Sequence, residues 1–102
     1  INDHMTSSFE LLYERIQPKG VYMVEDTHTC YWDEYGGGLR RPGSFIEYAK
    51  EKIDEINAVH SRSALPISPF TRGTDCIIFY DSVVVFEKRP QGARQAPITE
   101  PL

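Results

Sequence analysis

Apolar side chains recur at helical spacing in the first part of the chain. The capping-box pair Ser7 and Glu10 predicts a helix that begins near Ser7. Pro18 cannot extend this helix, and Gly20 follows it. The face that we expect to be buried consists of Met5, Phe9, Leu12 and Ile16.

A second helix is predicted from about Phe45 to His60, with Ser44 and Glu47 repeating the capping-box spacing. Its apolar stripe consists of Ile46, Ala49, Ile53 and Ile56. The charged positions on the other side are expected to face solvent, and they are Lys50, Glu51, Lys52, Asp54 and Glu55.

Three apolar runs predict strands. Val21–Val24 is short and continuous, as in a central strand buried on both faces. Cys76–Tyr80 and Val83–Glu87 flank the dipeptide Asp81-Ser82, and two turn residues between strand-like runs indicate a tight hairpin. The order along the chain is therefore helix, strand, helix and antiparallel hairpin, which is an α/β pattern.

The need to pair backbone hydrogen-bonding groups predicts the order of these strands in the sheet. A parallel strand needs ladders on both sides, so the last strand is expected between the other two and antiparallel to each. This gives three strands in the order first, third, second, with two main helices. The first strand, Val21–Val24, keeps one bare edge, where another strand of a larger sheet would pair.

Composition limits the function classes. A length of 102 residues allows one domain, and a formal charge of −4 argues against a nucleic-acid binder. The sequence contains no apolar run long enough to span a membrane and no signal-peptide pattern, so we expect no membrane partner and a cytoplasmic location. We expect a folded part over residues 1–88 and a flexible tail over residues 89–102, which is rich in Pro, Gly, Gln and Arg. The start at Ile1 suggests a segment of a longer protein.

Two adjacent carboxylates, Glu25 and Asp26, follow the first strand. In open α/β sheets, ligands bind beyond the carboxyl ends of the parallel strands. A hard cation such as Mg²⁺ takes oxygen ligands there, often from only one or two carboxylates. The alternative is that Glu25 caps a helix and Asp26 forms an ion pair in the loop.

The loop after this acidic pair offers binding groups. His28 could bond a substrate or act as a base, or it could bond a nearby carbonyl. Tyr31, Trp32 and Tyr35 present flat amphipathic faces suited to sugar rings or aromatic acceptors, or they cover the sheet edge. Three consecutive glycines from Gly36 allow a hinge or a close ligand approach, but they lack the spacing and the lysine of a phosphate-binding loop.

Three segments together resemble a known family. Residues 17–32 read QPKGVYMVEDTHTCYW, residues 44–58 contain the phrases FIE and IDEINA, and residues 78–85 read IFYDSVVV. They are similar to the late core of class I S-adenosylmethionine-dependent methyltransferases. The most similar subset is the metal-dependent macrolide-sugar O-methyltransferases and their bacterial relatives. Two departures are mild: Lys19 stands at a usual glycine and Cys30 at a usual serine.

The resemblance implies the C-terminal part of a Rossmann-like fold, with S-adenosylmethionine and Mg²⁺ as cofactors. It implies Glu25 and Asp26 as metal ligands, and an acceptor that is a small molecule, possibly a sugar, held by His28 and the aromatic loop. The catalytic histidine and a third carboxylate of the family belong to an Asp-Asp-Gly-Ser-His motif expected before Ile1. The glycine-rich cofactor loop lies further upstream, so we assign neither a catalytic nor a cofactor-binding residue to this chain. Alone, the chain is expected to be inactive.

Two other readings stay open. One is a small standalone α/β binding or interaction module, possibly a homo-oligomer. The other is a related enzyme from a family described as antibiotic hydroxylases, which shares the acidic pair and the aromatic loop. An upstream Asp-Asp-Gly-Ser-His motif with a glycine loop would favour methyl transfer, whereas a stable monomer without a bare strand edge would favour the standalone module.

Overall fold

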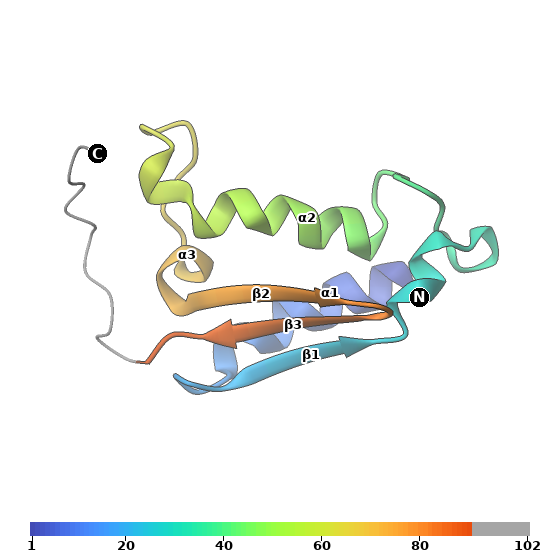
Figure 1. Ribbon diagram of the computed structural model, residues 1–102, viewed down its shortest axis with the longest axis horizontal. Coiled ribbons are helices and arrows are strands. Elements are labelled where there is room, and N and C mark those ends of the chain that lie inside the picture. Colours follow the sequence, from blue (N-terminus) through green and yellow to red (C-terminus); the bar gives the residue numbers. More distant parts are fainter. Residues whose placement is uncertain (91–102) are drawn as a thin grey trace.

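The computed structural model describes residues 1–90, with three helices beside a three-stranded sheet (Figure 1). The helices are α1 (Asn2–Leu12), α2 (Phe45–Ile56) and α3 (Pro69–Gly73), and the strands are β1 (Val21–Glu25), β2 (Thr74–Tyr80) and β3 (Val83–Lys88). From residue 91 on, the tail expected over 89–102 lies outside the described residues. Within residues 1–90, no helix has the length and apolar character that crossing a membrane requires.

The sheet has the predicted order β1-β3-β2, and β3 is antiparallel to both neighbours. The hairpin turn is tight because Ser82 adopts a left-handed conformation with φ of 64°. Strand β1 keeps the predicted bare edge, but the expectation that it is buried on both faces is wrong. Val21 is 49% exposed and Met23 is 56% exposed, since β1 pairs on one side only and the helices pack on the sheet face opposite these two side chains.

Phe86 on the central strand is the centre of the hydrophobic core. Its side chain is fully buried and meets one aromatic ring from each helix. The ring centroids of Phe9, Phe45 and Phe70 lie 4.4, 6.5 and 6.2 Å from that of Phe86. All three helices therefore cover the same face of the sheet, the face that also carries Val84.

Helix α1 begins at Asn2, more than a turn before the predicted start at Ser7. Asn2 is buried and bridges two distant segments: its side-chain amide donates to the Tyr35 carbonyl at 2.9 Å, and its side-chain oxygen accepts from the Phe45 backbone N–H at 2.8 Å. These tertiary hydrogen bonds order the first turn, so the local capping pair Ser7 and Glu10 ends up inside the helix.

The end of α1 also differs from the predicted stripe. Leu12 is 46% exposed, whereas Tyr13 is buried, shares a 2.8 Å hydrogen bond with the Thr74 hydroxyl and has its pKa raised by that burial. The Lys88 ammonium donates to the carbonyls of Tyr13, Glu14 and Ile16 at 2.9 to 3.4 Å and lies over the Tyr13 ring. The ammonium of Lys88 on the last strand thus binds the free carbonyl groups at the C-terminus of the first helical segment.

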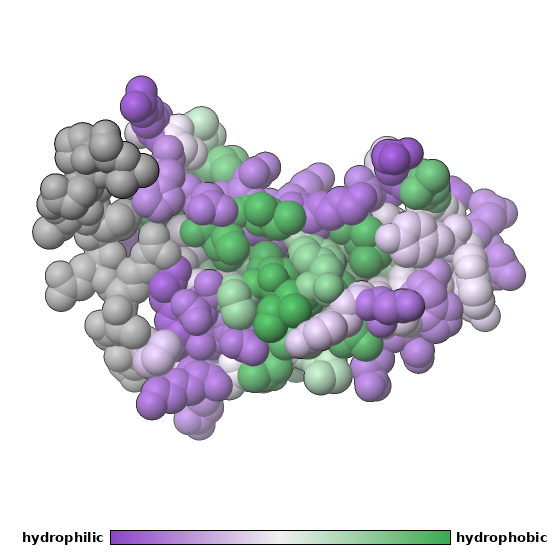
Figure 2. Space-filling view, viewed as in Figure 1, coloured by the Kyte–Doolittle hydropathy of each residue, from purple (hydrophilic) through white to green (hydrophobic). Residues whose placement is uncertain are grey.

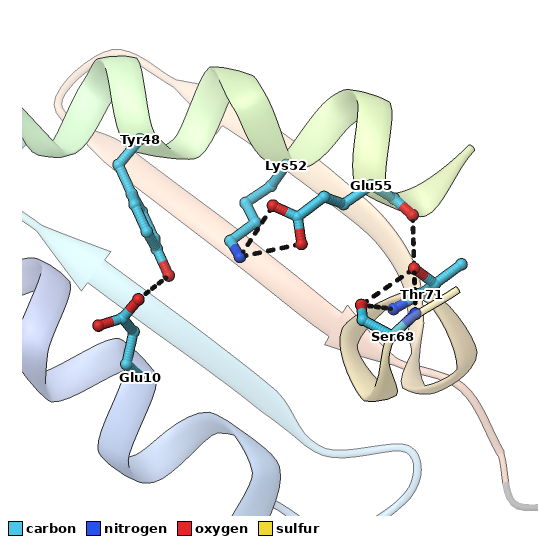
Figure 3. Close-up of polar contacts among 6 residues, drawn as sticks. All are labelled: Glu10, Tyr48, Lys52, Glu55, Ser68 and Thr71. Atoms are coloured by element: carbon cyan, nitrogen blue, oxygen red, sulfur yellow. Dashed lines mark hydrogen bonds and ion pairs between the residues drawn. The ribbon is translucent and has the colours of Figure 1, made fainter. Parts of the chain in front are cut away.

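Helix α2 begins as predicted, because the Ser44 hydroxyl accepts from the Glu47 backbone N–H at 3.3 Å. It ends at Ile56, and the predicted last turn is a separate 3₁₀ turn, Ala58–His60. Lys52 was expected in solvent, but its side chain is only 13% exposed. Its ammonium pairs with Glu55 (Figure 3). It also lies 4.8 Å from the ring centroids of both Tyr48 and Phe70, because the long stem of Lys52 packs over aromatic side chains.

Polar contacts on α2 attach it to both other helices (Figure 3). Tyr48 donates to the Glu10 carboxylate of α1 at 3.2 Å, and burial followed by the nearby Glu10 charge raises the pKa of Tyr48. Helix α3 was not predicted, although Ser68 and Thr71 form a reciprocal capping box around Pro69. Thr71 also donates to the Glu55 carbonyl at 2.8 Å, which fixes α3 at the end of α2.

We predict that Val84→Ala lowers the free energy of unfolding by about 2 kcal/mol, because it removes fully buried methyl groups beside Phe86. Val21→Ala is the matched control on another strand, and its loss should stay below about 1 kcal/mol because Val21 is half exposed. Urea unfolding followed by circular dichroism measures both. Equal losses in the two variants would contradict the described core.

We also predict that Asn2→Ala costs about 1–3 kcal/mol, since it leaves the buried Phe45 N–H without a partner. The near-UV circular dichroism of Trp32, the only tryptophan, should change as well, because Tyr35 stacks on it. Asn57→Ala, which removes an exposed hydrogen bond to the Ile53 carbonyl, is the control and should leave the Trp32 signal unchanged. A native Trp32 signal in Asn2→Ala would show that Asn2 does not hold this loop.

Candidate functional site

The acidic pair lies at the end of β1 next to the β2–β3 hairpin. Glu25 is the last strand residue and pairs with Val83, and Asp26 follows in a left-handed conformation with φ of 59°. The Asp26 carbonyl accepts from both the backbone N–H and the hydroxyl of Thr29, at 3.1 and 2.8 Å. The buried Thr27 donates its N–H to the Ser82 carbonyl at 3.0 Å. The backbone of the pair is therefore fixed.

Both carboxylates are exposed, and within residues 1–90 neither accepts a hydrogen bond nor forms an ion pair. Within residues 1–90, Glu25 does not cap a helix, because the caps that form side-chain hydrogen bonds are Ser44 and Ser68. In the same residues, Asp26 forms no ion pair. The two residues are adjacent in the sequence, and both side chains are acidic. Their hard oxygen atoms fit Mg²⁺. The described part of the chain adds no third carboxylate, thiol or imidazole to the pair.

His28 lies on the first 3₁₀ turn after the acidic pair, Thr27–Tyr31. Its Nδ1 atom lies 2.6 Å from the Ser82 hydroxyl, and its ring lies edge-to-face on Trp32 with centroids 5.1 Å apart. The expected alternative, a histidine bonded to a carbonyl, is not what is found. The hairpin hydroxyl holds one ring nitrogen, so the imidazole has a defined orientation and Nε2 stays available to a ligand.

The three aromatic residues of the loop are half exposed: Tyr31 is 47% exposed, Trp32 45% and Tyr35 38%. Trp32 and Tyr35 stack with centroids 6.0 Å apart. A side chain on Gly37 would overlap the carbonyl of the buried Cys30, so this glycine permits close backbone packing. The loop backbone is thus closely packed at Gly37, and the loop presents the stacked rings of Trp32 and Tyr35.

Next to this loop, a cavity of about 400 Å³ opens between α2, β2 and the hairpin. His28 and Tyr31 line it, so the structure brings these two predicted residues together with others that the sequence did not single out as site residues. Those others include Ile46, Lys50, Ile53, Phe79 and Ser82. A larger cavity of about 730 Å³ between α1 and α2 is lined by charged side chains such as Asp3, Arg40 and Glu51, and it contains none of the predicted site residues.

A second acidic cluster lies at the opposite end of the sheet, where the hairpin register brings Asp75, Cys76 and Glu87 within metal-ligand spacing. Its groups already have partners: Asp75 pairs with Arg89, and the Cys76 thiol donates to the Glu87 carboxylate at 3.4 Å. Burial, with Glu87 beside it, raises the pKa of Cys76 and keeps the thiol protonated. We assign this cluster a structural role.

The sequence is similar to macrolide-sugar O-methyltransferases. It is 28% identical over 92 residues to 8-demethyl-8-alpha-L-rhamnosyl tetracenomycin-C 2'-O-methyltransferase of Streptomyces olivaceus, a match that covers 87% of this chain and 24% of that protein. It is 43% identical over 59 residues to mycinamicin VI 2''-O-methyltransferase of Micromonospora griseorubida, covering 55% of this chain and 15% of the relative. A third relative, L-olivosyl-oleandolide 3-O-methyltransferase of Streptomyces antibioticus, is 39% identical over 61 residues, covering 56% of this chain and 16% of the relative. No protein-family model matches.

Solved structures agree with this similarity. MycE methyltransferase from the mycinamycin biosynthetic pathway, in complex with Mg and SAH, superposes with a TM-score of 0.79 at 28% identity, covering 99% of this chain and 27% of that one. The complex that also contains mycinamycin VI gives a TM-score of 0.75 at 31% identity, covering 99% of this chain and 26% of that one. The chain spans about a quarter of the length of these proteins. In sequence and in fold, it resembles the C-terminal part of the macrolide-sugar O-methyltransferases.

Proposed function

We propose that this chain supplies the metal-binding and acceptor-binding side of an S-adenosylmethionine- and Mg²⁺-dependent O-methyltransferase that acts on a sugar hydroxyl of a natural product. The observation that carries the proposal is the pair of exposed carboxylates of Glu25 and Asp26 at the carboxyl end of β1, which have no hydrogen-bond or ion-pair partner among residues 1–90. Two relatives are named for rhamnosyl- and olivosyl-bearing acceptors, and the structural neighbours contain Mg and SAH, the demethylated form of the methyl donor.

Glu25 and Asp26 would hold the cation, with further ligands from water and from parts of the protein beyond these residues. When bound, Mg²⁺ lowers the pKa of an acceptor hydroxyl and fixes its orientation. The chain's own contribution is to fix the backbone that carries the two carboxylates. The carbonyl of the left-handed Asp26 accepts two hydrogen bonds from Thr29, so the backbone need not be reordered when the carboxylates bind a cation.

The aromatic loop would bind the sugar. Trp32 and Tyr35 offer stacked faces for the apolar side of a pyranose ring, and Tyr31 lines the neighbouring cavity. His28, oriented by Ser82, would hydrogen-bond a sugar hydroxyl through Nε2. We do not propose His28 as the base: the resemblance assigns that role to a histidine outside this chain.

In this proposal residues 1–88 form the C-terminal part of the catalytic domain. The chain contains no glycine-rich turn between two parallel strands of the kind that holds a nucleotide cofactor. S-adenosylmethionine would therefore bind to another part of the protein, with its methyl group directed towards the acceptor at the acidic pair. The isolated chain would not transfer a methyl group.

We predict that Mg²⁺ shifts the backbone NMR signals of Glu25, Asp26 and Thr27 in the ¹⁵N-labelled chain. Asp26→Asn should weaken this binding by at least about tenfold, because it removes one of the two charged ligands. Asparagine tolerates the left-handed conformation of Asp26, so the backbone is preserved.

Asp54→Asn on α2 is the control for the loss of one negative charge, and its Mg²⁺ binding should equal that of the native chain. Equal Mg²⁺ binding by Asp26→Asn and Asp54→Asn, or shifts spread over all acidic surfaces, would contradict the assignment of the acidic pair as the metal site.

A further inference from the structure

We propose that Ser82 is a positioning residue of the candidate site. Its hydroxyl donates to Nδ1 of His28 and holds the neutral imidazole in the tautomer that carries its proton on Nε2. In this tautomer His28 donates a hydrogen bond to a sugar oxygen but has no lone pair with which to take a proton from the acceptor hydroxyl. The inference rests on the proposed function and deepens it, because it states which hydrogen-bonding role His28 has and which residue sets that role.

The distance between the two atoms identifies the hydroxyl as the donor. Ser82 Oγ lies 2.6 Å from His28 Nδ1. A bond that an N–H group donates to oxygen usually spans about 2.7–3.2 Å, whereas a hydroxyl donor approaches an oxygen acceptor to about 2.5–3.0 Å. The observed distance lies below the first range and inside the second. A neutral imidazole has one N–H and one lone pair, so a lone pair at Nδ1 leaves the proton on Nε2.

The Ser82 hydroxyl has no other hydrogen-bond partner within residues 1–90. The contact of the hairpin with the loop backbone uses the Ser82 carbonyl, which accepts from the Thr27 N–H at 3.0 Å. Ser82 is also left-handed, with φ of 64°, a conformation in which glycine is unstrained and a side chain is not. Glycine would therefore suit this turn, and the contact with His28 explains why a side chain with a hydroxyl stands there.

A second contact restricts the His28 ring. The ring lies edge-to-face on Trp32, with centroids 5.1 Å apart and an interplanar angle of 68°. His28 also follows the buried Thr27, whose N–H is bonded to the hairpin. The imidazole is therefore held by its backbone, by the Ser82 hydroxyl and by the indole, so its free nitrogen has a defined direction before a ligand binds.

The surroundings of His28 favour a donor at Nε2. The cavity of about 400 Å³ that His28 lines borders apolar surface: Figure 2 shows hydrophobic side chains gathered between α2 and the strands, with hydrophilic ones around them. Two charged residues also line this cavity, Lys50 and Asp81. Lys50 is paired with Glu47 at 2.6 Å, whereas Asp81 forms no hydrogen bond or ion pair within residues 1–90. The negative charge of Asp81 favours a proton over a lone pair on the ring nitrogen that Ser82 leaves free.

The test is long-range ¹H–¹⁵N NMR of the histidine rings in the ¹⁵N-labelled 102-residue chain, at a pH of about 9, at which imidazoles are neutral. Protonated and unprotonated ring nitrogens have well-separated ¹⁵N shifts, so the spectrum reports the tautomer. His28 should show a single tautomer with its proton on Nε2. His4 and His60 are exposed and should show the mixture of free imidazole, since within residues 1–90 their rings form no side-chain hydrogen bond. A proton on Nδ1 of His28 overturns the proposal.

Ser82→Gly separates positioning from a purely structural role. The thermal midpoint should stay about the same, because glycine relieves the left-handed backbone while it adds entropy to the unfolded chain. His28 should then show the mixture of free imidazole and lose its nuclear Overhauser contact with Trp32. Ser63→Gly is the matched control, because Ser63 is also left-handed, with φ of 71°, and exposed. A native His28 tautomer in Ser82→Gly, or an equal change in Ser63→Gly, contradicts the assignment of Ser82.

The Mg²⁺ titration of the acidic pair keeps this inference apart from the proposed function. Ser82→Gly should retain the Mg²⁺ shifts of Glu25 and Asp26, because it keeps the backbone bonds of Thr27 and Thr29. A His28 proton on Nδ1, with Mg²⁺ still bound at the acidic pair, overturns only the role of Ser82. The Nε2 tautomer in a native chain whose acidic pair ignores Mg²⁺ contradicts the proposed function and leaves the hydrogen bond from Ser82 to His28 in place.

Discussion

The contact of Phe86 with one ring from each helix is the interaction on which the rest of the structure depends. Phe86 lies on β3, the only strand of the sheet with neighbours on both sides, and it is fully buried. Because Phe9, Phe45 and Phe70 all pack against it, the three helices must lie on one face of the sheet. The same strand ends in Lys88, whose ammonium completes the C-terminus of the first helical segment. One strand thus fixes the sheet order and the position of every helix.

The candidate site follows from this arrangement. Since β3 runs antiparallel to β1, the hairpin before β3 lies beside the carboxyl end of β1. Ser82 in that hairpin therefore reaches both Thr27 and His28, and it orients the loop after the acidic pair. Asn2 secures the far end of the loop through the Tyr35 carbonyl. The backbone around Glu25 and Asp26 is thus held from both sides, while their carboxylates face solvent.

Much of the fold was predictable because local patterns and global packing agree. The strand order followed from hydrogen-bond accounting alone, and Ser44 caps α2 as its spacing predicts. The start of α1 was not predictable, because Asn2 is held by partners that lie more than thirty residues away in the sequence. Helix α3 was missed although Ser68, Pro69 and Thr71 carry a readable capping signal. This capping box has Thr71 where the usual sequence pattern has Glu or Gln, so the pattern does not reveal it.

The site was predictable in part. The acidic pair, His28 and the aromatic residues followed from their place after a strand, since loops at strand ends carry ligand groups. Their roles remain predictions. The cavity was not predictable, because it depends on the exposure of Ile53 and Phe79, whose sequence patterns are those of core residues. Only tertiary packing decides which apolar positions stay open.

The central claim is that this chain provides the metal and acceptor side of a sugar O-methyltransferase. The most direct test replaces the matching C-terminal segment of the mycinamicin VI 2''-O-methyltransferase by this chain and measures methyl transfer from S-adenosylmethionine to mycinamicin VI. The account predicts Mg²⁺-dependent transfer that Asp26→Asn lowers by at least about a hundredfold. A folded hybrid that binds S-adenosylmethionine but transfers no methyl group, or transfers it equally well with Asp26→Asn, would contradict the claim.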